Sequence, residues 1–214
     1  MANMRDLWYD WLGFNTFLFK KINSLSDLPA YGPLMKGITL FGEKNLLPYM
    51  LGAICIFAFS SIVVRIVLNK GGARNYLFTW ITITLMISSG LFISNSIVDY
   101  ITSTASYPRP YVLIPANEIN LLEILPVAEA YRSFPSVHVI IITILAFSLW
   151  STLNETFRWI AVLLVFSVAW SRIALGVNFP MDVISGFAIT LTQMILIRYV
   201  LYGIVRTIRM ALKI

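Results

Sequence analysis

Three short stretches of the chain carry side chains that could bind a phosphate group and act on it. The candidates, in chain order, are Arg109, then Ser136 and His138, then Arg172 and Asp182. An arginine offers a planar fork of charged donors that matches phosphate oxygens, and a histidine exchanges a proton near neutral pH. Two arginines, a hydroxyl and a histidine that converge at one place would form an oxyanion or phosphate site.

Each candidate also has a simpler structural interpretation. Arg109 could be a solvated loop charge, and His138 an interface histidine. Ser136 and Asp182 could cap the helices that follow them. Arg172 is the hardest to explain in this way, because an arginine within an apolar span costs about 2.5–3.5 kcal/mol on insertion scales. Arg172 therefore needs a water-filled pocket and an anionic partner.

The composition indicates an integral membrane protein. Of the 214 residues, 58% are hydrophobic and 12% are charged, against about 25% charged in soluble domains. The mean hydropathy is +0.80. A soluble fold, a disordered chain and a disulfide scaffold are excluded, the last because there is one cysteine. The net charge of +6 fits basic residues at helix ends facing lipid headgroups, so no nucleic-acid partner is predicted.

The hydropathy pattern predicts an all-α, polytopic bundle of five, or at most six, transmembrane helices. A span needs about 20 apolar residues. The five stretches that meet or approach this length are Leu46–Leu68, Leu77–Val98, Val137–Leu153, Trp159–Gly176 and Met181–Val200.

The N-terminal region differs from these spans. Apolar residues recur at near-helical spacing in Leu7–Leu25, with polar residues between them, which indicates an amphipathic helix lying in the interface. Pro33–Phe41 could form a second, short helix of this kind. The alternative is a sixth, tilted span, against which Lys20 and Lys21 argue. We therefore predict interfacial helices in residues 1–45 and a transmembrane bundle in residues 46–214, with an active-site loop at 99–136.

With five spans, all the phosphate-site candidates lie on one side of the membrane. The long loop at 99–136 and the turn Val177–Pro180 share that side. Asn69–Tyr76, Asn154–Arg158 and the basic tail share the other, and their Lys and Arg residues favour the cytoplasm. The lysines of the N-terminal segment weaken this bias. The site is accordingly predicted to face outward.

The order and spacing of the candidates resemble the three-part signature of the type 2 phosphatidic-acid phosphatase superfamily of membrane lipid phosphatases. Its pattern is K-x6-R-P, then P-S-x-H, then S-R-x5-H-x3-D. Arg109-Pro110 matches the end of the first part, and Pro135-Ser136-Val137-His138 matches the second. The third part matches in spacing from Ser171-Arg172 to Asp182.

This resemblance implies a helix bundle of five or six spans with its site at the outer leaflet. It implies that the histidine of the third motif attacks phosphorus, that Asp182 orients that histidine, and that His138 protonates the leaving oxygen. Arg109, Ser136 and Arg172, with a lysine at position 102, would hold phosphate oxygens. No metal or other cofactor is expected.

Two positions depart from the pattern. The lysine position is Thr102, and the nucleophile position is Asn178 in a chain with one histidine. A carboxamide does not form a stable phosphorylated intermediate, so the usual covalent route is closed. Three explanations stay open: an engineered trap, a natural and catalytically silent relative that binds or carries a lipid phosphate, or slow direct attack by water with His138 as the base.

The substrate is predicted from a looser similarity. The loop segment at 117–126 and the segment Phe19–Leu25 are similar to bacterial enzymes that act on undecaprenyl diphosphate, including phosphotransferases to lipid A. A lipid A phosphatase is the nearest alternative. The resemblance thus implies a phosphatase or phosphotransferase of the bacterial inner membrane, facing the periplasm. A non-catalytic lipid-phosphate binder is the rival hypothesis. The sequence indicates no oligomeric state.

Overall fold

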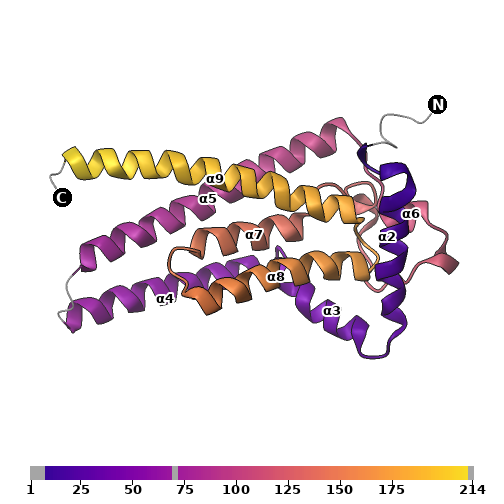
Figure 1. Cartoon of the computed structure of the whole chain (residues 1–214), viewed down its shortest axis with the longest axis horizontal. Helices are drawn as coiled ribbons and strands as arrows, with labels where there is room; N and C mark the ends of the chain where they lie inside the picture. Colours follow the sequence, from indigo (N-terminus) through magenta and orange to yellow (C-terminus); the bar gives the residue numbers. More distant parts are fainter. Residues whose placement is uncertain (1–7, 69–71, 212–214) are drawn as a thin grey trace.

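A computed structural model describes residues 8–68 and 72–211. Four helices are long and apolar enough to cross a membrane (Figure 1), which confirms the predicted helix bundle at four of its five spans. They are α4 (Leu47–Val67), α5 (Ala73–Thr104), α8 (Glu155–Ala174) and α9 (Pro180–Ala211). The described residues form no strand, apart from one isolated bridge between Tyr107 and Arg132.

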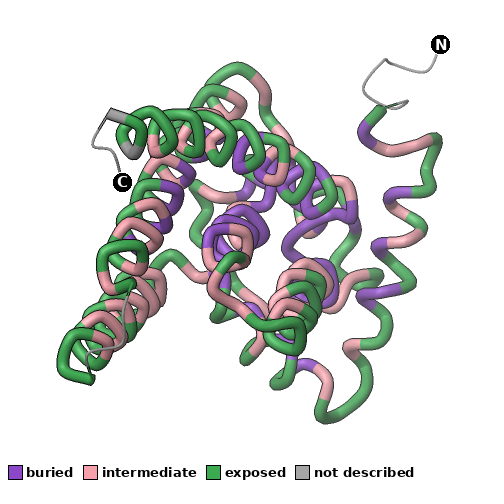
Figure 2. The backbone as a smooth tube through the Cα atoms, turned by 60° about the vertical axis from the view of Figure 1, so that its left-hand side comes forward, coloured by how far each residue is buried: buried purple, intermediate pink, exposed green. Residues whose placement is uncertain are grey.

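The third predicted span is a shorter helix at the centre of the bundle. This helix, α7, covers Val137–Leu149, which corresponds to about 20 Å, less than the roughly 30 Å of a hydrocarbon core. It ends early because the chain turns at Trp150–Thr152. Eight of its side chains are buried, and Figure 2 shows it enclosed by the other helices. A helix covered by protein on most sides does not need to match the thickness of the membrane.

The chain is helical at its N-terminal end, as predicted, in two short pieces. They are α2 (Phe14–Asn23) and α3 (Tyr31–Thr39), with 3-10 turns at Trp11–Gly13, Ser24–Asp27 and Leu40–Gly42. In Figure 1, α2 runs across the end of the bundle rather than along it. It buries Phe19 and exposes Phe17, and its ten residues are too few to cross a membrane. Leu7, the start of the predicted amphipathic stretch, lies outside the described residues.

The long loop begins later than the sequence suggests. Helix α5 continues to Thr104, six residues into the range predicted as loop. The remainder contains the four-residue helix α6 (Pro110–Leu113) and 3-10 turns at Ala116–Glu118 and Val127–Glu129. Because backbone groups outside helices must still be hydrogen-bonded where they are buried, the loop is tied down by its own side chains and by those of α2. One such tie joins Asn23 to the backbone carbonyl of Asn120, with an N–O distance of 2.9 Å.

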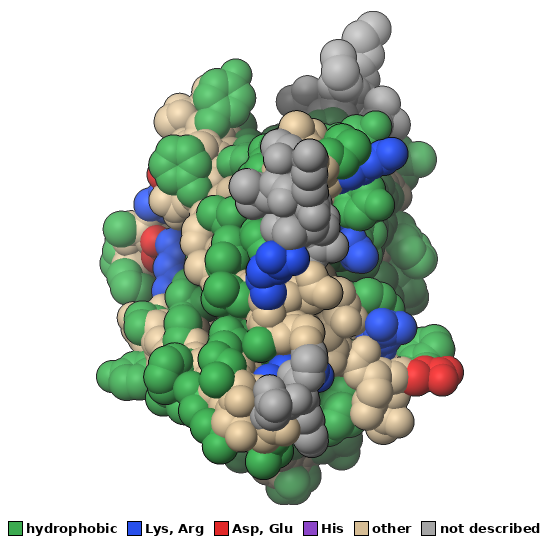
Figure 3. Space-filling view, turned by 90° about the vertical axis from the view of Figure 1, so that its left-hand side faces the viewer, with side chains coloured by type: hydrophobic (Ala, Val, Ile, Leu, Met, Phe, Trp, Pro, Cys, Tyr) green, Lys and Arg blue, Asp and Glu red, His purple; other side chains and the backbone are tan. Residues whose placement is uncertain are grey.

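Basic side chains gather at the end of the bundle away from α2. Figure 3 looks onto this end and shows several Lys and Arg side chains among a largely apolar surface. Basic residues of α4, α8 and α9 that lie toward this end are Arg65, Arg158, Arg198 and Arg206. This is the side that the predicted orientation assigns to the cytoplasm.

The contact between the Leu40–Gly42 turn and the start of α7 yields a first prediction. A Cβ atom added to Gly42 would lie 2.7 Å from the Cβ atom and the backbone oxygen of His138. We expect Gly42→Ala to destabilise the protein by about 1–3 kcal/mol, because the backbone must shift to relieve the overlap. The melting temperature in detergent measures the effect.

Gly37→Ala is the matched control for this prediction. Gly37 lies inside α3, and an added Cβ atom would meet nothing within 4 Å. This substitution should stabilise the protein by about 0.5–1 kcal/mol, since alanine favours a helix over glycine. Equal effects of the two substitutions would show that the turn does not pack against α7 as described.

Candidate functional site

The centre of the candidate site is the buried side chain of Arg172, in the last turn of α8. Arg172 is 1% exposed. Its Nη1 atom donates to Glu123 Oε2 at 2.7 Å and to Thr39 Oγ1 at 2.9 Å. Its Nε atom donates to Asn178 Oδ1 at 3.3 Å. Because a buried charge needs an opposite charge and hydrogen bonds, three segments far apart in the sequence converge on this guanidinium.

Asn178 lies in the turn between α8 and α9, where the chain reverses through Gly176, whose φ angle is +81°. A positive φ is unfavourable for residues with a Cβ atom, and a Cβ atom here would also lie 2.8 Å from the Asn120 carbonyl oxygen. The turn directs the Asn178 amide inward. Its Nδ2 atom donates to the Ser133 carbonyl at 2.8 Å and lies 3.4 Å from Asp182 Oδ2. The amide thus bridges the space between Arg172 and Asp182.

Asp182 is fully buried in the first turn of α9. Its carboxylate accepts hydrogen bonds from the Tyr9 hydroxyl at 2.6 Å, the Ser133 hydroxyl at 2.5 Å and the Phe179 backbone N–H at 2.7 Å. Its own backbone carbonyl accepts from the Ser136 N–H at 3.1 Å. The Asp182 carboxylate is therefore fixed in position by donors from three different segments, as a residue that orients a neighbouring side chain must be.

His138 and Ser136 lie at the start of α7. His138 Nε2 is 3.1 Å from Glu43 Oε2. This hydrogen bond lowers the pKa of the Glu43 carboxyl below its usual value, against the opposing effect of partial burial, and the charges of His138 and Arg172 lower it further. The Ser136 hydroxyl is buried and has no hydrogen-bond partner within the described residues. An unpaired buried hydroxyl is costly unless a ligand or water supplies the partner.

Arg109 is 7% exposed and is held mainly by carbonyl oxygens. It donates to Glu129 O and Val177 O, both at 2.8 Å, and to Arg132 O at 3.1 Å. A longer contact of 3.4 Å joins it to the Glu129 carboxylate. In this conformation Arg109 joins the long loop to Val177, the residue before Asn178.

Among the described residues, no hydrogen bond joins Thr102 to Arg172, Asn178 or Asp182. Its hydroxyl donates to the Val98 carbonyl at 2.9 Å and accepts from Arg132 Nη2 at 3.3 Å. Arg132 also lies 3.6 Å from the carboxylate of Asp99. A cation is therefore present beside position 102 although the residue at that position is neutral. Sequence reasoning missed Arg132, because it belongs to none of the three motifs.

Sequence reasoning also missed four residues that complete the site. Thr39 and Glu123 bind Arg172, Glu43 binds His138, and Tyr9 binds Asp182. The sequence indicated that Arg172 needs an anionic partner, but nothing in the spacing identifies which carboxylate supplies it. Within residues 8–68 and 72–211, no group of three His, Cys, Asp or Glu side chains is arranged to hold a metal ion.

Two solved structures share this architecture. The crystal structure of Aquifex aeolicus LpxE superimposes with a TM-score of 0.61 at 22% identity, covering 87% of this chain and 95% of that one. A transmembrane PAP2 type phosphatidylglycerolphosphate phosphatase from Bacillus subtilis gives a TM-score of 0.59 at 18% identity, covering 92% and 90%. At such low identity these similarities establish the fold alone. No curated protein sequence matches the chain.

The sequence profile of the PAP2 superfamily matches residues 78–206, more than half of the chain. The matched region includes α7, α8 and most of α5 and α9, and so contains all three motifs. The chain belongs to the PAP2 superfamily, and its fold is that of a membrane lipid phosphatase.

Proposed function

We propose that this protein binds the terminal phosphate of a membrane lipid in the pocket around Arg172, and that Asn178 prevents turnover through a phosphorylated enzyme. The observation that carries the proposal is the position of Asn178 itself. Its amide lies between the Arg172 guanidinium at 3.3 Å and the Asp182 carboxylate at 3.4 Å. A nucleophilic histidine would need this place between a phosphate-binding cation and an orienting carboxylate.

The other polar groups of the pocket suit a phosphate. Arg172 can offer charge-assisted hydrogen bonds to two phosphate oxygens. The Ser136 hydroxyl is buried without a partner and can donate to a third. His138 lies beside Glu43, which can hold the imidazole in one orientation for proton transfer to a leaving oxygen. Arg109 can serve as a further phosphate ligand, because its five N–H donors make four hydrogen bonds within the described residues.

For the ligand we propose undecaprenyl diphosphate or a phosphate of lipid A, at the periplasmic face of a bacterial inner membrane. The similarity of the loop at 117–126 to enzymes of this class supports the proposal. Glu123, the partner of Arg172, lies within that loop segment. The superfamily's lipid phosphatases and the fold shared with LpxE are in keeping with such a ligand.

The first experiment restores the missing nucleophile. Asn178→His should release phosphate from undecaprenyl diphosphate at least about 100-fold faster than the unsubstituted protein, because the Asp182 carboxylate is already in place to orient an imidazole. Phosphate release in detergent is the measurement. Asn178→Gln, which enlarges the side chain without adding an imidazole, is the control and should stay inactive.

The other outcomes distinguish the alternatives. If Asn178→His releases no phosphate but still binds lipid, a disabled enzyme is excluded. The lipid-phosphate binder or carrier then remains. Slow release by the unsubstituted protein that disappears in His138→Gln would instead indicate direct attack by water, with His138 as the base.

We propose that the ligand competes with Glu123 for the Arg172 guanidinium. In the ligand-free pocket, the Glu123 carboxylate occupies the donor group that a phosphate oxygen would use. Its side chain is 21% exposed, against 1% for Arg172, so it can move toward solvent. A phosphate must therefore supply at least the free energy that this carboxylate supplied. Weakly charged headgroups of abundant lipids would then fail to occupy the pocket.

A second prediction follows from this competition. Glu123→Gln should raise the affinity for a lipid phosphomonoester about tenfold or more, because a contact between charged groups contributes about 1.5–3 kcal/mol. A binding isotherm with phosphatidic acid in nanodiscs, at fixed salt concentration, measures the change.

Glu118→Gln is the matched control for this measurement. Glu118 lies on the same loop and forms an exposed ion pair with Lys20 at 2.6 Å, so its loss should change the affinity little. Weaker binding by Glu123→Gln would contradict displacement and would make Glu123 a residue that positions Arg172 for the ligand.

A further inference from the structure

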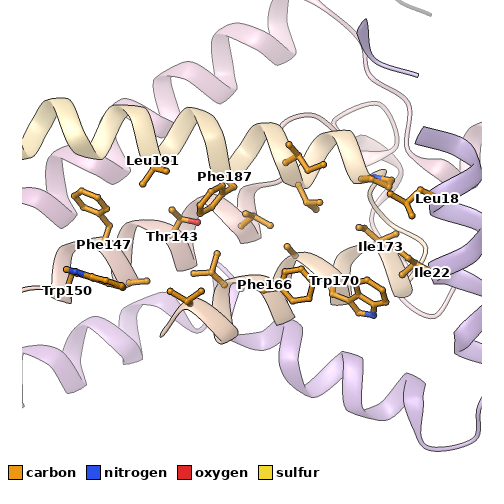
Figure 4. Close-up of a pocket in the computed structure, with 18 of the residues that line it drawn as sticks. Leu18, Ile22, Thr143, Phe147, Trp150, Phe166, Trp170, Ile173, Phe187 and Leu191 are labelled. Carbon is orange, nitrogen blue, oxygen red and sulfur yellow. The ribbon is translucent and has the colours of Figure 1, made fainter. Parts of the chain in front are cut away.

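A cavity lies on the flank of the bundle, and its lining does not include Arg172, Asn178 or Asp182. Helices α7, α8 and α9 enclose a groove of about 650 Å³ (Figure 4). Near the phosphate-site end of the groove, Phe19 and Phe179 are buried in the apolar core. Their ring centroids are 5.2 Å apart. Phe166 and Phe187 line the groove and are 62% and 42% exposed. The groove is therefore accessible from the surroundings of the bundle, which in a membrane are lipid chains.

The groove contains a polar atom that has no hydrogen-bond partner among residues 8–68 and 72–211. Thr143, on α7, is 3% exposed, and its Oγ1 atom makes no hydrogen bond within the described residues. Figure 4 shows this oxygen beside Phe187 within the groove. By contrast, Thr82 and Thr84 on α5 each donate to the carbonyl four residues earlier. A buried donor left unpaired is costly, so the Thr143 hydroxyl indicates a ligand that presents an acceptor at this depth.

The end of the groove away from the phosphate site carries positive charge. Arg198 of α9 lines the groove, and its guanidinium lies 5.8 Å from the ring centroid of Phe147. Arg158 lies 5.5 Å from the ring centroid of Trp150 and donates to the Trp150 carbonyl at 3.2 Å. Within the described parts of the chain, neither arginine forms an ion pair with a carboxylate.

The spacing of these groups matches one class of ligand. Thr143 and Phe147 are four residues apart on α7, a rise of about 6 Å, so the unpaired hydroxyl lies one helical turn deeper than the ring beside Arg198. Anionic glycerophospholipids present the same order of groups: a negatively charged phosphate, then ester carbonyls, then hydrocarbon chains. Beyond Thr143 the groove is lined by apolar residues such as Val139, Ile173 and Ile184.

We propose that this groove binds one anionic glycerophospholipid from the leaflet opposite the phosphate site. Arg198 binds its phosphate, Thr143 donates a hydrogen bond to an ester carbonyl, and an acyl chain lies along α7 toward Ile173. Because the acyl chain is already surrounded by hydrocarbon in the bilayer, the charged contact and the hydrogen bond supply the selectivity. The proposal does not depend on the ligand of the Arg172 pocket.

The experiment measures lipid retention by the full chain in detergent, using native mass spectrometry with added phosphatidylglycerol. Arg198→Gln should weaken binding of this lipid about tenfold, through loss of a charged contact. Arg206→Gln is the control, because it removes the same charge from α9 two turns farther from the groove. Thr143→Val should weaken binding of the ester lipid severalfold, and should have no effect on a dialkyl ether phosphatidylglycerol, which lacks the carbonyl acceptor.

Three results would overturn the proposal. Equal losses in Arg198→Gln and Arg206→Gln would indicate general attraction to a basic surface. Equal losses of ester and ether lipids in Thr143→Val would show that the hydroxyl does not meet a carbonyl. Retention of phosphatidylcholine as strong as that of phosphatidylglycerol would exclude recognition of an anionic headgroup. Melting temperatures of the lipid-free variants, expected to match the unsubstituted protein, separate these outcomes from misfolding.

Discussion

The burial of the Arg172 guanidinium is the constraint on which the rest of this structure depends. A charge that is 1% exposed at the end of an apolar helix is tolerable only when carboxylate and hydrogen-bonding partners surround it. Helix α8 supplies none of the side-chain partners. Thr39 comes from α3, Glu123 from the long loop and Asn178 from the turn before α9. The fold must therefore bring α3, the long loop and the end of α8 with its following turn, three segments distant in the sequence, to one end of the bundle.

This requirement explains the role of the N-terminal helices. Helix α2 crosses the end of the bundle (Figure 1), and its Asn23 donates to the Ala174 carbonyl at 2.9 Å, close to the end of α8. Helix α3 delivers Thr39 to Arg172, and the turn after it leads to Glu43 beside His138. The N-terminal segment thus places a hydroxyl against Arg172 and a carboxylate against His138. Under the proposed function, an incoming phosphate would compete with Glu123 for Arg172.

The sequence predicted the elements that depend on local pattern. The helix bundle and the short N-terminal helices follow from hydropathy. In the structure, Ser136, Arg172, Asn178 and Asp182 lie in one hydrogen-bonded region, whereas Arg109 and His138 bond to other partners. The length of α7 was overestimated, because apolarity does not distinguish a buried helix from a span. Glu43 and Glu123 were missed, because their pairing depends on how loops fold over the bundle end, and that contact is non-local.

Asn178 shows how a single residue type changes the chemistry while the geometry is kept. The amide is hydrogen-bonded to Arg172 and lies 3.4 Å from the Asp182 carboxylate, yet a carboxamide cannot accept a phosphoryl group as a stable intermediate. Thr102 is a second departure, and Arg132 beside it supplies a cation from elsewhere in the loop. Under the proposed function, the site would hold a phosphate but lack the group that forms a covalent bond to it.

The most direct test of this account is a double-mutant cycle on thermal unfolding of the ligand-free protein, using Arg172→Met and Glu123→Gln singly and together. Each single variant should be destabilised, and the double variant should be less destabilised than their sum, with a coupling free energy of at least about 1 kcal/mol. If the two single changes in the free energy of unfolding add within about 0.5 kcal/mol, this account is contradicted. Arg172 and Glu123 would then not form the buried pair on which the site depends.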